Sequence, residues 1–190
     1  MQWYGYSLST FGIRDMSGII AKSNSINLLV DSCSTKMILK AIPSDSYRKW
    51  SSGLGGIISY CGGDNSHIVN CFSNMNALVT GYHAAAGIVC TVAGTNTIIE
   101  KCISNSKITI GVRSPQYGSE VYYGHTNAIA GILSGTLDNN SYAEIKNCIA
   151  FDEYVKPIGG AANISGITRG HSKTSNCYSL SSLNISETAR

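Results

Sequence analysis

The chain has 190 residues, of which 43% are apolar and only 13% are charged, and its formal net charge at pH 7 is +3. This apolar fraction argues against a disordered chain, and the small net charge without a Lys/Arg run argues against a nucleic-acid partner. The sequence contains no run of 18 apolar residues, so we expect no membrane insertion. Its N-terminal residues lack the pattern of a signal peptide. We expect residues 1–190 to form a single domain, as a fragment of, or a module in, a larger assembly.

A short phrase of a small residue, glycine and isoleucine occurs five times, each time followed by a cysteine. The glycines of this phrase are Gly18, Gly56, Gly87, Gly131 and Gly166, and the cysteines are Cys33, Cys71, Cys102, Cys148 and Cys177. The five units span approximately residues 16–41, 54–79, 85–110, 129–156 and 164–185. Repetition at this period is typical of a solenoid, in which each unit buries its apolar face against the next.

Each unit contains three short apolar stretches, which we take in chain order as three predicted strands. The first surrounds the Gly-Ile phrase and covers residues 16–20, 54–58, 85–89, 129–133 and 164–168. The second leads into the cysteine, at residues 30–34, 68–72, 99–103, 145–149 and 174–178. The third follows six and eight residues after the cysteine and is weakest in the fourth unit.

Stretches this short, rich in Ile and Val and separated by Asn, Ser and Gly, favour strands over helices. Stacked in register they predict an all-β fold: a right-handed parallel β-helix, or β-solenoid, of about five coils with three short strands per coil. The hand follows from the rule for parallel crossovers. Glycine in the first strand predicts a close approach of backbones or a bend at a corner.

The cysteines at one register of the repeat predict a ladder of small buried side chains rather than a disulfide framework or a metal site. Strict alternation from the isoleucine three residues earlier points the cysteine outward, but a bulge at the residue before it reverses this. We favour an inward cysteine because cysteine is so often buried. Asn70, Asn147 and Asn176 precede three of the cysteines, and their side chains are expected to bond to one another between coils as a ladder. Cys61 and Cys90 are the remaining candidates for a pair.

The phrases Gly-Gly-Ile-Ile followed by Ile-Val-Asn-Cys-Phe-Ser, and Ser-Gly-Ile followed by Ser-Asn-Cys-Tyr-Ser, resemble the GLUG-type repeats of bacterial adhesins and large surface proteins. The resemblance covers roughly residues 16–185. It implies a right-handed β-helix and a surface-exposed, adhesin-like protein. Similar coils occur in viral fibres and polysaccharide lyases, so the fold alone does not assign a function.

The connections that lead back to each Gly-Ile strand differ in length, and all of them are expected at one corner of the coil. They span residues 42–53, 80–84, 111–128 and 157–163. The candidate ligand-binding residues in them are Tyr47, Arg48, Trp50, Tyr82, His83, Arg113, Tyr117, Tyr122, Tyr123 and His125. Aromatic rings with Arg suit a face that binds a glycan or a protein. Alternatively, the rings fold back and pack over the corner.

Acidic residues are scattered along the chain, and only Asp152 and Glu153 form a local cluster. Neighbouring residues on a strand point to opposite faces, so these two carboxylates cannot act on one bond. Asp31 and Glu100 share a register of the repeat but lie two coils apart, with Val69 between them. We therefore expect no enzymatic activity, no cofactor and no metal ion.

The favoured function is a non-enzymatic stalk of an adhesin-like protein at the cell surface, with the loop corner as its binding face. A structural component of a virion or fibre, assembling through uncapped solenoid ends, is the first alternative. Many unpaired cysteines suit folding in a reducing cytosol, which favours that alternative. A polysaccharide-processing β-helix is the second alternative.

Overall fold

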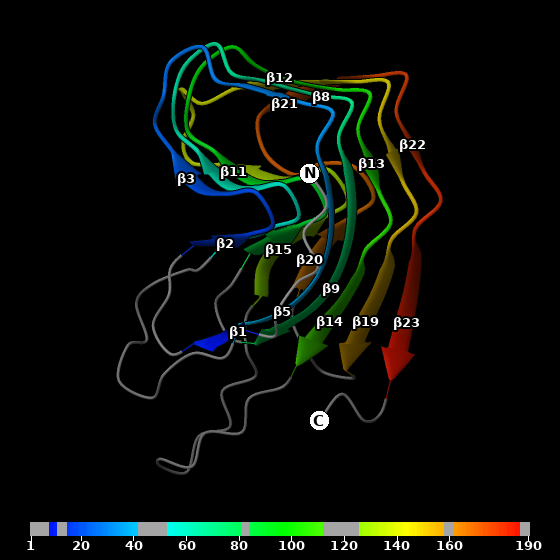
Figure 1. Cartoon of the computed structure of the whole chain (residues 1–190). Helices are drawn as coiled ribbons and strands as arrows, with labels where there is room; N and C mark the ends of the chain where they lie inside the picture. Colours follow the sequence, from blue (N-terminus) through cyan, green and yellow to red (C-terminus); the bar gives the residue numbers. More distant parts are fainter. Residues whose placement is uncertain are drawn as a thin grey trace.

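The computed structural model describes residues 8–10, 15–41, 53–80, 84–111, 126–157 and 162–186. These residues form four sheets of parallel strands stacked in a repeating order, which is a parallel β-solenoid of about five coils (Figure 1). The predicted all-β solenoid is therefore confirmed. Each coil has four strand positions instead of the predicted three, because the Gly-Ile phrase forms a corner between two strands.

Each coil contributes to every sheet in the same order. The first sheet contains β2 (Asp15–Ser17), β6 (Gly53–Gly55), β10 (Ala84–Ala86), β15 (Thr126–Ala130) and β20 (Ala162–Ser165). The second sheet contains β3 (Ile20–Ser23), β7 (Ile58–Cys61), β11 (Val89–Val92) and β16 (Leu133–Thr136), and the fifth coil adds a bridge from Thr168 to Leu133. The third sheet contains β4 (Leu29–Asp31), β8 (His67–Val69), β12 (Thr97–Glu100), β17 (Ala143–Lys146) and β21 (Ser172–Ser175).

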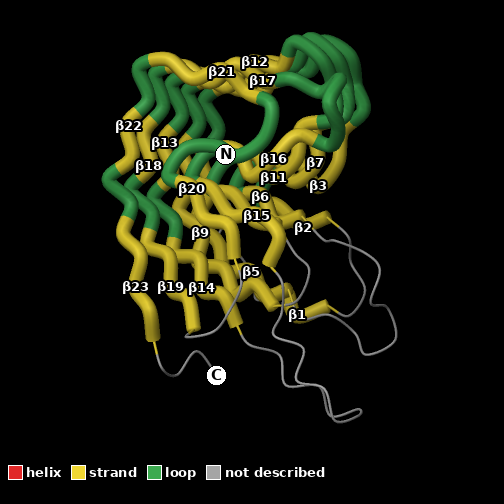
Figure 2. The backbone as a smooth tube through the Cα atoms, turned by 180° about the vertical axis from the view of Figure 1, so that it is seen from behind, coloured by secondary structure: helices red, strands yellow, loops and turns green. Residues whose placement is uncertain are grey.

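The fourth sheet is the longest and runs along one side of the molecule (Figure 2). Its first two coils contribute β5 (Ser34–Ala41) and β9 (Phe72–Thr80). Later coils break the strand in two: β13 (Ile103–Ser104) with β14 (Lys107–Gly111), β18 (Ile149–Ala150) with β19 (Glu153–Pro157), and β22 (Tyr178–Ser179) with β23 (Ser182–Ser186). An additional strand, β1 (Leu8–Thr10), pairs with the end of β5, with Leu8 opposite Leu39.

Equivalent residues of successive coils lie directly above one another and form columns. On the third sheet Val30 pairs with Ile68, Ile68 with Ile99, and Ile99 with Ile145, and all four side chains are buried. The cysteine column faces the same interior: Cys71, Cys102 and Cys148 are buried, while Cys33 and Cys177 in the two end coils are partly covered. The favoured inward orientation of the repeat cysteines is thus confirmed.

The residue before each cysteine adopts a left-handed backbone conformation, and this turns the cysteine inward. The φ angles are 53° at Ser32, 55° at Asn70, 53° at Lys101, 53° at Asn147 and 50° at Asn176. Asparagine is the non-glycine residue best suited to this conformation, which explains its recurrence here. The predicted asparagine ladder is wrong for Asn70, whose Nδ2 donates to Asp31 Oδ1 at 3.0 Å, and Lys101 separates it from Asn147.

A second left-handed corner precedes the third sheet and was not predicted. Asn27, Asn65 and Asn96 have φ angles of 60°, 55° and 54°. Here two asparagines of neighbouring coils do bond to each other, since Asn96 Nδ2 donates to Asn65 Oδ1 at 3.2 Å. The corner asparagines therefore serve first as turn formers, and bonding between coils follows where two of them stack.

The repeat glycines bring the Gly-Ile corner of each coil into close contact with the fourth sheet. We call this narrow part of the coil the waist. A Cβ atom on Gly56 would overlap the carbonyl oxygen of Gly87 and the side chain of Ser73. Gly87 is confined in the same way by Ser104 of the fourth sheet and by the carbonyl oxygen of Gly131. The predicted close approach at the repeat glycine is therefore confirmed, and its partner is a small residue two positions after the cysteine.

Two apolar clusters lie on either side of this waist. The first is enclosed by the second, third and fourth sheets and contains Ile57, Ile58, Ile68, Ile99 and the repeat cysteines. The second lies between the first sheet and the far half of the fourth sheet and contains Met16, Leu54, Met75, Ala77 and Ile108. Figure 2 shows the course of the strands that enclose them: β12, β17 and β21 at the top, and β14, β19 and β23 below. Each coil thus has a two-lobed cross-section.

Candidate functional site

The corner that carries the predicted loops is defined by the strands that anchor them. The fourth-sheet strands before the connections end at Ala41, Thr80, Gly111 and Pro157, and the first-sheet strands after them begin at Gly53, Ala84, Thr126 and Ala162. Thr80 pairs with Gly111, and Ala84 pairs with Gly53 and Ala128. The anchors of successive connections are therefore neighbours, and the predicted common corner is confirmed for them.

The ten candidate ligand-binding residues themselves lie outside the described residues. They are Tyr47, Arg48, Trp50, Tyr82, His83, Arg113, Tyr117, Tyr122, Tyr123 and His125. The spacing of stacked strands places anchors two coils apart at about 10 Å from each other. Two side chains of Trp or Tyr size can bridge a distance of this order. The positions of the anchors are therefore compatible with one shared binding face, which stays a prediction.

A second candidate surface, which sequence reasoning missed, is an exposed apolar row on the outer face of the fourth sheet. Phe72 pairs with Ile103, Ile103 with Ile149, and Ile149 with Tyr178. Phe72, Ile103 and Tyr178 are 38%, 37% and 65% exposed. The signal was present in the sequence, because an apolar residue follows the cysteine in four of the five units.

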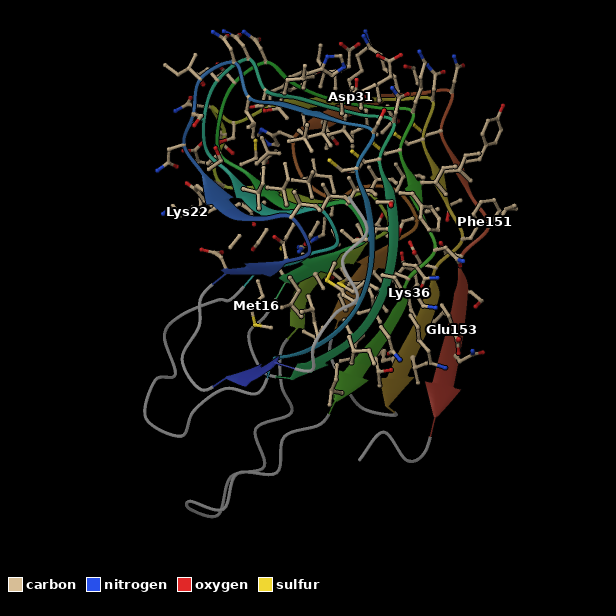
Figure 3. All side chains as sticks on the ribbon, in the orientation of Figure 1. Met16, Lys22, Asp31, Lys36, Phe151 and Glu153 are labelled. Carbon is tan, nitrogen blue, oxygen red and sulfur yellow. The ribbon has the colours of Figure 1, made fainter. Side chains whose placement is uncertain are left out.

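Two further apolar side chains widen this row in the last two coils. Phe151 and Leu180, each two residues beyond the row, are 44% and 71% exposed. Phe151 projects away from the sheet (Figure 3). Contiguous apolar side chains on a solvent-facing sheet are typical of a contact surface. Its polar border includes Lys107 Nζ, which lies 3.0 Å from Glu153 Oε1 and lowers the pKa of that carboxyl.

The outer face of the third sheet is charged but internally paired. Lys146 Nζ lies 2.8 Å from Glu144 Oε2, and this contact raises the pKa of Lys146. His67 Nε2 lies 3.7 Å from Glu100 Oε2 in the next coil. Asp31 pairs with Val69, and Val69 with Glu100, so these two acids are two coils apart as predicted.

Asp152 and its neighbour Glu153 point to opposite sides of the fourth sheet, as predicted. Asp152 is buried, and burial raises the pKa of its carboxyl to about 6. Its Oδ1 accepts hydrogen bonds from Ser104 Oγ at 2.5 Å and from the backbone N–H of Ser106 at 2.7 Å. Its Oδ2 lies 3.2 Å from Tyr154 Oη, which also lies 3.2 Å from the carbonyl oxygen of Ser165.

Tyr154 has one hydroxyl proton, and its oxygen lies within hydrogen-bond distance of both Asp152 Oδ2 and the Ser165 carbonyl oxygen. Tyr154 donates to the Asp152 carboxyl, and this bond, with those from Ser104 and Ser106, opposes the effect of burial on the Asp152 pKa. These contacts join the fourth coil to the third through Asp152 and to the fifth through Tyr154. Asp152 is therefore a structural group and has no free position for a substrate.

The seven cysteines are free thiols, including Cys61 and Cys90, the pair suggested by the sequence. Cys61 belongs to the first apolar cluster, whereas Cys90 lies against Gly53 on the other side of the second sheet. Burial raises the pKa of Cys61 and raises that of Cys90 to about 11. A thiol needs a lowered pKa to act as a nucleophile at neutral pH, so these two are inert packing groups.

The repeat cysteines donate to carbonyl oxygens. The Sγ atom of Cys102 lies 3.3 Å from the oxygen of Glu100 and 3.6 Å from that of Ile68, and Cys148 repeats this geometry one coil later. Across the described ranges, no three His, Cys, Asp or Glu side chains gather closely enough to hold a metal ion. The same residues include no helix of the length and apolarity needed to cross a membrane.

Comparison with known proteins gave no relative: no family model matches the chain, and no curated protein or solved structure matches it. The resemblance to GLUG-type repeats therefore stays a prediction from the sequence. The fold and the surfaces described above carry the functional argument.

Proposed function

We propose that this chain is a non-enzymatic β-solenoid segment of a surface-exposed, adhesin-like protein, in which the coil acts as a rigid stalk and the loop corner binds a glycan or a protein. The observation that carries the proposal is the register of the loop anchors: Thr80 lies beside Gly111, and Gly53 beside Ala84. Stacked anchors bring successive loops onto one face, and solenoids commonly bind through such faces.

Support for binding rather than catalysis comes from the polar groups of the described coils. The carboxyl of Asp152 is held inside the coil by Ser104, Ser106 and Tyr154. Glu153 is paired with Lys107, and Glu144 with Lys146. These acids serve the fold. We therefore assign recognition to the aromatic residues of the loops and infer that the protein lies at a cell or virion surface.

The proposal is tested by replacing Trp50 and Tyr122 together with alanine. We expect binding to a glycan array or to cells to weaken about tenfold or more, because large rings dominate such contacts. Tyr178→Ala, which removes an exposed ring from the fourth sheet, is the matched control. An unchanged binding signal with the double variant contradicts the loop face, and loss with Tyr178→Ala instead moves recognition to the apolar row.

A structural subunit of a virion or fibre is the second candidate. One observation favours it: in the last described coil the apolar side chains of Leu183 and Ile185 are 51% and 66% exposed. Seven free thiols also suit assembly in a reducing compartment. Long open-ended polymers of the purified chain in electron micrographs would place this function first.

A further inference from the structure

The repeat cysteines of the three middle coils form a column of thiols inside the first apolar cluster. Cys71, Cys102 and Cys148 are buried, and each of their coils has a neighbouring coil on both sides. The backbone N–H of Ile103 donates to the carbonyl oxygen of Cys71 at 2.8 Å, and that of Ile149 donates to the carbonyl oxygen of Cys102 at 3.0 Å. The three cysteines are therefore stacked in register on successive coils.

All three thiols point in the same direction. The Sγ atom of Cys71 lies 3.2 Å from the carbonyl oxygen of the residue two positions earlier and 3.7 Å from a carbonyl oxygen of the preceding coil. The corresponding distances are 3.3 Å and 3.6 Å for Cys102, and 3.2 Å and 3.6 Å for Cys148. Because these distances repeat, the sulfur atoms repeat at the spacing of the strands, which is about 4.8 Å.

This spacing of the sulfur atoms is too wide for a disulfide and suits a single bridging ion. The Cβ atoms of a disulfide lie about 3.5–4.5 Å apart, which is closer than in-register neighbours on stacked strands. A metal–thiolate bond is about 2.3 Å long, so an ion midway between two of these sulfur atoms would lie at bonding distance from both. The two sulfur atoms would then lie on opposite sides of the ion.

Two-coordinate ligation of this kind is characteristic of Cu(I) and Ag(I), which also prefer soft thiolate ligands. Zn(II) takes four ligands, and in the described part of the chain no three His, Cys, Asp or Glu side chains gather at one point. Apolar side chains, among them Ile68 and Ile99, surround the column, so a bound ion must leave the site neutral. A monovalent ion that displaces one thiol proton meets this condition, since it leaves one thiolate and one thiol around it.

We propose that the cysteine column is a binding site for a monovalent thiophilic cation of the Cu(I) class, held between the Sγ atoms of Cys71 and Cys102 or of Cys102 and Cys148. The two ligands come from successive coils, so the bound ion links these coils through the interior. No spacing within one repeat indicates the site, because its ligands belong to different repeats. The inference goes beyond the proposed function and uses no loop residue.

The first test compares two variants that keep the same number of thiols. Both carry Cys33→Ser and Cys177→Ser, so that only the three middle cysteines of the column remain. Adding Cys148→Ser leaves the neighbouring pair Cys71 and Cys102, whereas adding Cys102→Ser leaves Cys71 and Cys148, which are two coils and about 10 Å apart. Serine keeps a donor for the carbonyl oxygens, and circular dichroism checks that both variants fold.

Ag(I) is the probe, because it has the same coordination preference as Cu(I) and needs no reductant. Its binding is measured by equilibrium dialysis of the folded chain against excess glutathione, a monothiol that outcompetes single protein thiols such as Cys61 and Cys90. The variant with the neighbouring pair is expected to retain one ion per chain. The variant with the separated pair is expected to bind at least about a hundredfold more weakly, because one ion cannot contact both sulfur atoms.

A second measurement reads the coordination of the ion directly. X-ray absorption of the Ag(I) complex of the neighbouring-pair variant should show two sulfur neighbours. Ag(I) should also raise the unfolding temperature of this variant, because the two ligands are held together only in the folded chain. The unfolding temperature of the separated-pair variant should not rise.

Three outcomes overturn the inference. They are equal binding of Ag(I) by the two variants, three or more sulfur neighbours around the ion, and binding only after urea has unfolded the chain. The Trp50→Ala and Tyr122→Ala double variant should bind Ag(I) like the unmodified chain. Failure of the loop-binding proposal and failure of the ion site are thus separate results.

Discussion

At the scale of single residues, Asp152 shows how an acidic side chain becomes part of an interior. At the same position of the column, the second coil has Met75, the third coil has Ser106 and the fourth coil has Asp152. The Asp152 carboxyl accepts hydrogen bonds from Ser104 and Tyr154. Burial disfavours the charged form of this carboxyl and raises its pKa to about 6, although the hydrogen bonds from Ser104, Ser106 and Tyr154 lower it.

This pKa predicts a pH-dependent stability. The folded pKa lies above the ordinary value of 3.8, so the stabilisation is complete at low pH and is lost as the pH rises through about 6. The unfolding free energy should fall by up to about 3 kcal/mol between pH 4 and pH 7 from this group. Asp152→Asn removes the titratable carboxyl, keeps the size of the side chain and should remove that part of the slope in urea unfolding. Equal slopes for variant and unmodified chain would contradict the assignment.

The cysteine column shows what the sequence could and could not predict at this scale. Its existence follows from the five-fold repeat, but its direction depends on the backbone one residue earlier. A left-handed residue at Asn70 or Asn147 breaks the two-residue alternation of a strand. Asparagine suggests that conformation, whereas Lys101 in the same position gives no signal of it. The direction was therefore inferred from the usual burial of cysteine rather than from the local pattern.

At the scale of elements, the glycine at the waist separates the first-sheet strand of each coil from its second-sheet strand. The Gly-Ile phrase looks like one apolar strand because residues on both sides of it are buried. In the structure the glycine turns the chain against the fourth sheet, and the flanking residues enter two different apolar clusters. Apolar periodicity alone cannot separate one buried strand from two strands around a buried corner, so three strand positions were predicted instead of four.

The waist predicts a large difference between two glycine substitutions. Gly87→Ala should destabilise the fold by about 1–3 kcal/mol or more, because its Cβ would meet Ser104 and the carbonyl oxygen of Gly131. Gly135→Ala is the control, since the nearest atom to its Cβ is the Arg169 oxygen at 3.7 Å. The unfolding free energies from urea titration compare the two. Equal small effects would mean that the coil relaxes at the waist without cost.

At the scale of the whole molecule, stability should follow the position of a coil in the stack. A solenoid unit contacts only its neighbours, so a coil with one neighbour opens more easily than a coil with two. We expect amide hydrogen exchange in β21 and β23 to be about a hundredfold faster than in β11 and β12. Uniform exchange across the coils would instead show that the array opens as one unit.

The candidate surfaces differ in how far the sequence could locate them. The loop corner follows from the repeat, because connections at the same point of each unit must share a corner. The apolar row on the fourth sheet required the direction of each side chain, which the left-handed residue before the cysteine reverses. The exposure of Leu183 and Ile185 could not be predicted either, because it depends on their place in the last described coil. A sequence pattern gives equal weight to every copy of the repeat and cannot distinguish that coil.

The columns also have a consequence for how such a chain can change over generations. Each coil presents a similar order of features to its neighbours: a glycine at the waist, then a left-handed residue followed by a cysteine before the fourth sheet. Exact duplication or loss of one unit by recombination would therefore create a junction that already fits. The stack can change its length in whole coils while each loop keeps its place relative to its own anchors. Length and loop content are thus free to evolve separately.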